Sequence, residues 1–201
     1  MNEVIGPIHQ WLYNKIIMQE SINMQIFNLA EEMQWIDTLK EKTNDEIGIA
    51  TFGQLEAVAD KEDVHGWLQK RVELVENRFA FAVMTLLKED ASRLEAIEHC
   101  LYKFGTHVVL KNANNAVEVA AEIDALLLNG MPCDGAMSVI EKNEEYVKME
   151  ITKLIHESYW EKQGGTNEIY EQLIDSFIQG VLSKSEYLSS REGKIRKIFR
   201  K

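Results

Sequence analysis

The sequence predicts an all-α protein, an up-down antiparallel bundle of four long helices followed by a shorter C-terminal helix. Three observations lead to this class. Apolar residues recur at intervals of three and four over most of the chain, which is the helical period. The 201 residues contain only two prolines, so little interrupts long helices. We find no segment with the apolar-polar alternation of a half-buried strand, and short connections between long helices favour antiparallel neighbours.

The first helices are delimited by start and stop signals. Pro7 suits the first position of a helix that runs to about residue 42. Residues 43–53 break the apolar pattern and form the first turn, and a second helix covers about 54–88. Ser92 begins a capping box with the glutamate three residues on, so a third helix starts there. Gly105 is expected to bend or break that helix.

Two further helices complete the bundle. Gly130 and Pro132 give a stop signal for the third helix. Asp134 is a good N-cap for a fourth helix that ends at about residue 162, before a pair of glycines. A fifth helix is expected over about 167–187.

The domain prediction is a single helical-bundle domain over residues 1–190 with a basic C-terminal tail over 191–201. The tail carries six Lys and Arg against one Glu, and we expect it to be solvated or to lie against the acidic body. A contact with an acidic partner or a membrane surface is the open alternative. The net charge of the chain is −11, which argues against general nucleic-acid binding because phosphate contacts need clustered Lys and Arg.

A cytoplasmic location is expected. The N-terminal residues lack the pattern of a secretory signal, and no stretch approaches the roughly 20 apolar residues of a membrane span. Cys100 and Cys133 lack CxxC spacing and are expected to be reduced thiols. Because Cys133 precedes an expected helix start, an activated thiol at this position is a second interpretation.

Residues 8–20 resemble residues 64–76. His9, Trp11, Leu12 and Glu20 in the first segment match His65, Trp67, Leu68 and Glu76 in the second. Either the first two helices descend from one unit or the match arises by chance.

The antiparallel arrangement predicts a metal site in the core. Glu20 and Glu76 are equidistant from the first turn, so they should face each other across the first hairpin. His107 and His156 are equidistant from the turn near residues 130–133 and should face each other across the second. Both glutamates lie on apolar helix faces, where a carboxylate must be paired, protonated or bound to a metal. Imidazole and carboxylate together suit iron, manganese or zinc.

The first functional hypothesis is therefore a metal-binding helical bundle, with redox or metal-dependent enzymatic activity left open. Its alternative is a non-enzymatic binding or scaffold protein without metal, which uses an apolar pocket for a small-molecule ligand or a helix interface in a homo-oligomer. A buried glutamate that pairs with Arg78, Lys15 or a tyrosine would support the alternative. His9 and His65 become candidate ligands if the helices pair differently.

Overall fold

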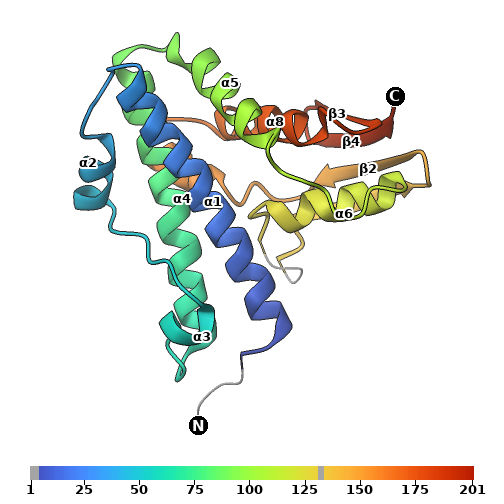
Figure 1. The fold of residues 1–201 in the computed structure, drawn as a ribbon, viewed down its shortest axis with the longest axis horizontal. Coiled ribbons are helices and arrows are strands. Elements are labelled where there is room, and N and C mark those ends of the chain that lie inside the picture. Colours follow the sequence, from blue (N-terminus) through green and yellow to red (C-terminus); the bar gives the residue numbers. More distant parts are fainter. Residues whose placement is uncertain (1–4, 131–133) are drawn as a thin grey trace. The chain divides into compact units, whose positions relative to one another are not determined.

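The computed structural model describes residues 5–130 and 134–201, and their contacts separate the chain into two compact units (Figure 1). Unit 1 holds residues 1–91 and 126–128, and unit 2 holds residues 92–125 and 129–201. The described residues form eight helices and one four-stranded antiparallel sheet. The predictions of an all-α class and of four long helices plus a shorter one are therefore wrong. The prediction of one domain over 1–190 stays a prediction.

Unit 1 is built on two long helices that run in the same direction. Its elements are α1 (Pro7–Glu32), α2 (Leu39–Glu46), α3 (Leu55–Val58) and α4 (Val64–Glu89). Helices α1 and α4 lie side by side, and α2 and α3 sit on the segment that returns between them (Figure 1).

Side-chain contacts fix the direction of the α1–α4 pair. At the starts of the helices, His9 Nε2 lies 3.1 Å from His65 Nε2. Further along both helices, Asn23 Nδ2 donates to the Val75 carbonyl at 3.2 Å. Residues therefore face partners about 52 to 58 positions later, so the pair is parallel and the predicted antiparallel hairpin is wrong.

Unit 2 combines helices with the sheet and contains all but the last residue of α6. Its elements are α5 (Arg93–Gly105), α6 (Ala116–Leu126), β1 (Met137–Lys142), β2 (Tyr146–Ile151), α7 (Glu157–Lys162), α8 (Asn167–Leu182), β3 (Tyr187–Glu192) and β4 (Ile195–Arg200). The strand order is β1-β2-β4-β3, and all pairs are antiparallel. Helix α8 follows α7 and contacts β3.

The predicted fourth helix is replaced by a hairpin and the short helix α7. In β2 the buried residues Val147, Met149 and Ile151 alternate with charged residues, which is the strand period. The edge strand β1 shows no such alternation, since most of its residues are exposed. Within the described part of the chain, Asp134 therefore precedes a strand rather than capping a long helix. Cys133 lies outside the described residues.

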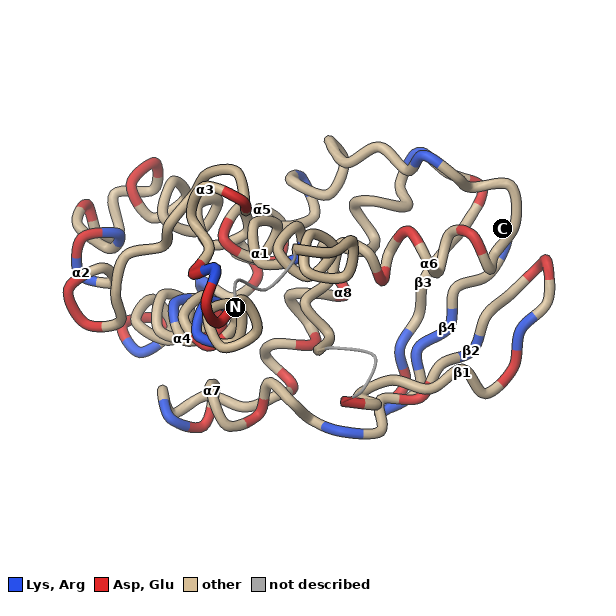
Figure 2. Tube along the Cα trace, turned by 90° about the horizontal axis from the view of Figure 1, so that it is seen from below, with Lys and Arg blue, Asp and Glu red and all other residues tan. Residues whose placement is uncertain are grey.

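The basic segment 191–201 belongs to the sheet. It contains the end of β3 and all of β4. The two strands turn at Gly193, whose φ of +57° favours glycine. Figure 2 shows the basic positions of β3 and β4 next to each other, since Arg191 pairs with Arg196 in the register.

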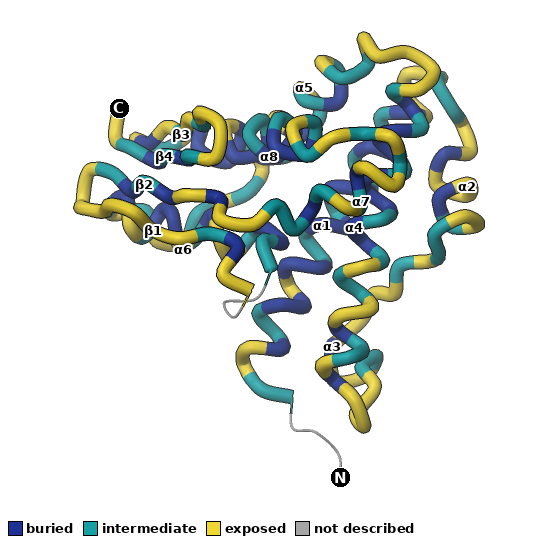
Figure 3. Tube along the Cα trace, turned by 180° about the vertical axis from the view of Figure 1, so that it is seen from behind, coloured by how far each residue is buried: buried dark blue, intermediate teal, exposed yellow. Residues whose placement is uncertain are grey.

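Helices α5 and α8 cross with their backbones in contact. A Cβ at Gly180 would lie 2.1 Å from the Tyr102 carbonyl oxygen, and one at Gly105 would lie 2.4 Å from the Phe177 carbonyl oxygen. The Phe104 and Phe177 rings stack next to the crossing, with centroids 5.8 Å apart. Figure 3 shows α8 as one of the most buried elements of its unit.

None of the helices in the described residues combines the length and apolar character that a membrane span requires.

Candidate binding site

Unit 2 contains a surface pocket of about 580 Å³, which we call the α8 pocket. One wall is the loop that follows α5, and the other is the end of α8 with the link to β3. Half of the lining residues are apolar, and the remainder are polar or charged. The pocket is lined by Thr106, His107, Val108, Val109, Leu110, Ala113, Val181, Lys184, Ser185 and Glu186.

Two glutamates of α6 hold the loop wall. Glu122 accepts hydrogen bonds from the Lys111 backbone N–H at 3.1 Å and from Asn112 Nδ2 at 2.9 Å. These bonds lower the pKa of Glu122 because they stabilise its ionised form. Glu118 accepts from the backbone N–H and the side-chain amide of Asn114. The loop is thus attached to a helix although half of its residues, 106–115, are exposed.

The opposite wall is held by the crossing of α5 and α8 and by two hydrogen bonds. Lys184 Nζ donates to the Thr106 carbonyl at 2.9 Å, so a cation of one wall binds the backbone of the other. Tyr187 at the start of β3 donates to the Asn114 carbonyl at 3.3 Å. On the loop wall, Val109 leaves 81 % of its surface exposed.

Positive charge gathers at the rim of the α8 pocket. The carboxylate of Glu186 is paired with Arg200 at 2.6 Å, and Lys201 Nζ donates to the Ser185 carbonyl at 2.7 Å. The hydrogen bond to Glu186 raises the pKa of Arg200. Arg200 also lies 3.6 Å from the Glu145 carboxylate, so the three cations Lys184, Arg200 and Lys201 exceed the two carboxylates by one charge.

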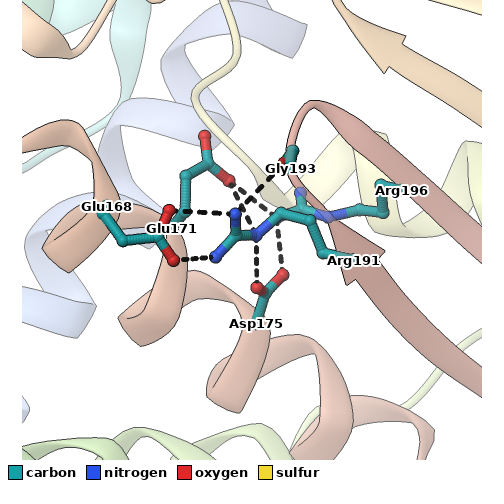
Figure 4. A network of polar contacts seen from close by, with 6 residues as sticks. All are labelled: Glu168, Glu171, Asp175, Arg191, Gly193 and Arg196. Atoms are coloured by element: carbon teal, nitrogen blue, oxygen red, sulfur yellow. Dashed lines mark hydrogen bonds and ion pairs between the residues drawn. The ribbon is translucent and has the colours of Figure 1, made fainter.

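A network of ion pairs fastens α8 to the β3–β4 hairpin (Figure 4). Arg191 donates to Glu168 at 2.7 Å and to Asp175 at 2.6 Å, and Arg196 donates to Glu171 at 2.9 Å and to Asp175 at 2.7 Å. Burial disfavours the Arg191 cation, but its hydrogen bonds outweigh this effect and raise its pKa. The network sets the position of α8 against the hairpin, and hence of the wall that α8 supplies.

A second cavity of unit 2 is much smaller, at about 10 Å³. His156, Glu171 and Arg196 are among its lining residues, and all three are buried. The His156 ring stacks on Tyr170 with the centroids 3.8 Å apart. A space of this size accepts about one water molecule, so it has no room for a substrate.

The predicted ligands Glu20 and Glu76 lie in unit 1 and are buried. Arg78 Nε and Nη2 donate to both oxygens of Glu20 at 2.8 to 3.1 Å, and Asn23 Nδ2 also donates to Glu20 at 2.8 Å. Arg78 further donates to Asn44 Oδ1 at 2.8 Å and to the carbonyl of the following loop. Glu20 is thus engaged in an ion pair with Arg78, one of the partners that the sequence analysis named.

The predicted ligands His107 and His156 lie in unit 2. His107 is exposed at the end of α5, and its Nδ1 lies 2.9 Å from the Lys103 carbonyl. His156 is the N-cap of α7. Among the residues that the structure describes, no three His, Cys, Asp or Glu side chains are grouped as metal ligands. The metal site stays a prediction.

The alternative ligands His9 and His65 do meet, and their hydrogen bonds indicate their tautomers. His9 Nδ1 accepts from the Gly6 backbone N–H at 3.0 Å, so the proton of its neutral ring lies on Nε2. That Nε2–H then donates to His65 Nε2 at 3.1 Å. A metal would need the lone pair that this proton occupies, so the geometry is that of a hydrogen-bonded pair.

Of the residues that line the α8 pocket, only His107 was a candidate from the sequence. A signal for the others exists in the apolar run Val108–Leu110, three residues after Gly105, because three consecutive apolar residues in a loop favour a binding surface. Comparison of the chain with protein-family models, curated proteins and solved structures found no match.

Proposed function

We propose that this protein binds a small, largely apolar molecule in the α8 pocket. The observation that carries the proposal is the pocket's size together with its lining. Ligand sites typically measure about 300–1,000 Å³, with apolar walls and a few polar groups that orient the ligand. The α8 pocket falls in this range at about 580 Å³ and combines five apolar residues with the polar groups of its rim.

The core metal site is not the function that we propose. A metal at Glu20 would have to displace Arg78, which donates to both carboxylate oxygens inside the unit. Removal of an arginine from a buried pair leaves an uncompensated charge and costs about 3–5 kcal/mol. The ion pair therefore supports a structural role for this carboxylate.

The neutral fluorescent probe N-phenyl-1-naphthylamine tests the proposal. We expect the wild-type protein to enhance its fluorescence saturably at one site. Val109→Asp places a charge inside the pocket and should weaken binding at least about tenfold, because the apolar probe then contacts a hydrated carboxylate. Val139→Asp is the matched control, since Val139 is also an exposed valine but lies on β1 outside the pocket.

The proposal fails if the probe shows no saturable binding, or if Val109→Asp and Val139→Asp change its affinity equally. Circular dichroism of both variants shows whether they retain the fold.

A further inference from the structure

The charges at the rim of the α8 pocket point to the class of ligand. We propose that the pocket selects amphipathic anions, with the apolar part against residues 108–113 and the anionic group beside Lys184. This inference rests on the proposed function and adds the chemistry of the ligand's polar end.

The charge balance at the rim is the first step. The pocket lining includes one lysine, Lys184, and one glutamate, Glu186. The Glu186 carboxylate is bound by Arg200 at 2.6 Å, whereas Lys184 Nζ donates to a neutral acceptor, the Thr106 carbonyl, at 2.9 Å. An ammonium group has three N–H donors, so Lys184 can keep this bond and still donate to a ligand.

The second step is the neighbourhood of Lys184. Lys201 Nζ lies on the Ser185 carbonyl, one residue further along the chain. Two lysines and Arg200 thus lie at this rim with two carboxylates, Glu186 and Glu145, which both pair with Arg200, so one positive charge is in excess in a chain whose net charge is −11. Such a local excess of positive charge favours an anion over a neutral ligand or a cation.

The third step is the arrangement of apolar and charged groups. Val108, Val109, Leu110 and Ala113 follow one wall, and Lys184 spans to the start of that wall at Thr106. The apolar surface and the charge are therefore adjacent, which matches a molecule with an apolar body and an acidic end. A carboxylate is the simplest such end.

Displacement of N-phenyl-1-naphthylamine by decanoate and by 1-decanol tests this inference, because the two competitors share a chain length and differ in charge. We expect decanoate to displace the probe from wild-type protein at lower concentration than decanol. Lys184→Met should reduce this preference about fivefold, the scale of one exposed ion pair or charge-assisted hydrogen bond. Lys184→Arg should retain it, and Lys40→Met, an exposed lysine of α2, is the matched control.

The outcomes separate the two proposals. If the probe does not bind, the proposed function fails. If the probe binds but decanoate shows no preference, or if Lys184→Met leaves the preference unchanged, the inference on the anion fails and the apolar pocket stands. Equal weakening of both competitors by Lys184→Met also contradicts the inference, because it indicates a structural role of this lysine.

Discussion

Single buried charges determine much of unit 1. Arg78 is 2 % exposed and connects α1 through Glu20, α2 through Asn44 and the loop at Gly48. The sequence predicted that a carboxylate on the apolar face of α1 needs a partner, and that expectation follows from desolvation alone. It named Arg78 as one of several candidate partners, and only the structure shows that Arg78 is the one that pairs with Glu20.

Removal of one member of the Glu20–Arg78 pair should destabilise the protein strongly. We expect Glu20→Leu and Arg78→Leu each to lower the free energy of unfolding by about 3–5 kcal/mol, because each leaves a buried charge without its main partner. The double variant should lose less than the sum of the two. Urea denaturation followed by circular dichroism measures all three values.

The test compares the loss of stability in the double variant with the sum of the two single losses. Strictly additive losses would contradict direct coupling between the two side chains. Arg71→Leu is the control, since this arginine of the same helix bonds to Thr51 at 3.4 Å at the protein surface and should cost less than about 1 kcal/mol.

At the scale of elements, the sequence predicted where some helices begin and end but not how the helices pack against each other. Helix α5 starts directly after Ser92 and ends at Gly105, as expected from the capping box and the glycine, although the Ser92 side chain makes no capping hydrogen bond to the helix. Helix α8 also begins at Asn167 as predicted. These ends depend on local chemistry, which a sequence carries directly.

The relative direction of α1 and α4 depends on the segment between them, which carries α2 and α3 and returns the chain to the starting end of α1. Glu20 and Glu76 are equidistant from the first turn, but they are also 56 positions apart, the same separation as His9 and His65. An antiparallel and a parallel register therefore place the glutamates at the same level. The matching segments 8–20 and 64–76 were the evidence for the parallel register, and they were interpreted only as a sign of common origin.

The sheet was missed because its strands resemble helix faces. In β4, Ile195, Ile198 and Phe199 are spaced by three and four residues, which is the helical pattern. The buried residues of this strand are Arg196 and Ile198, two positions apart, and the charge of Arg196 conceals the strand period. Only the ion pairs with α8 explain why an arginine occupies a buried position.

The crossing of α5 and α8 gives a prediction at this scale. Gly180→Ala should destabilise the protein by about 2–3 kcal/mol, because the new Cβ would collide with the Tyr102 carbonyl and force the helices apart. Thermal and urea denaturation measure the loss. The variant should also weaken binding of N-phenyl-1-naphthylamine, since Thr106 and Val181 lie directly beside the crossing in sequence.

Gly6→Ala is the control for added bulk at a glycine. Nothing lies within 4 Å of a Cβ at Gly6, but Gly6 is the N-cap of α1, where glycine is preferred over alanine, so its change should cost at most about 1 kcal/mol. A Gly180→Ala variant as stable as Gly6→Ala would show that the two helices do not touch at this point.

At the scale of the whole molecule, acidic and basic residues are distributed unequally. The chain carries 33 Asp and Glu against 22 Lys and Arg, yet residues 184–201 hold seven Lys and Arg against two Glu, and they include the basic positions of β3 and β4 (Figure 2). The sequence showed this excess in residues 191–201 but left its partner open. Part of the answer lies within the chain, because α8 supplies the acidic residues that bind Arg191 and Arg196.

Acid should weaken both the fold and the proposed pocket. Glu122 and Glu168 have pKa values below the ordinary 4.5, lowered by the Lys111 backbone N–H and by Arg191 respectively. Their stabilisation is therefore complete above about pH 4.5 and disappears as the pH falls through the lowered values. Glu98 acts in the opposite direction, since burial and Glu95 raise its pKa.

Because Glu122 and Glu168 lose stabilisation in acid and only Glu98 gains it, we expect a net loss of stability below pH 4.5. Urea midpoints between pH 3 and 6 would measure this loss. Protonation of Glu122 also releases the loop at Lys111 and Asn112, so binding of N-phenyl-1-naphthylamine should weaken over the same interval. Glu122→Gln cannot ionise, and it should make both quantities less dependent on pH. If this variant follows the wild-type pH profile, then Glu122 does not couple the acid response to the pocket wall.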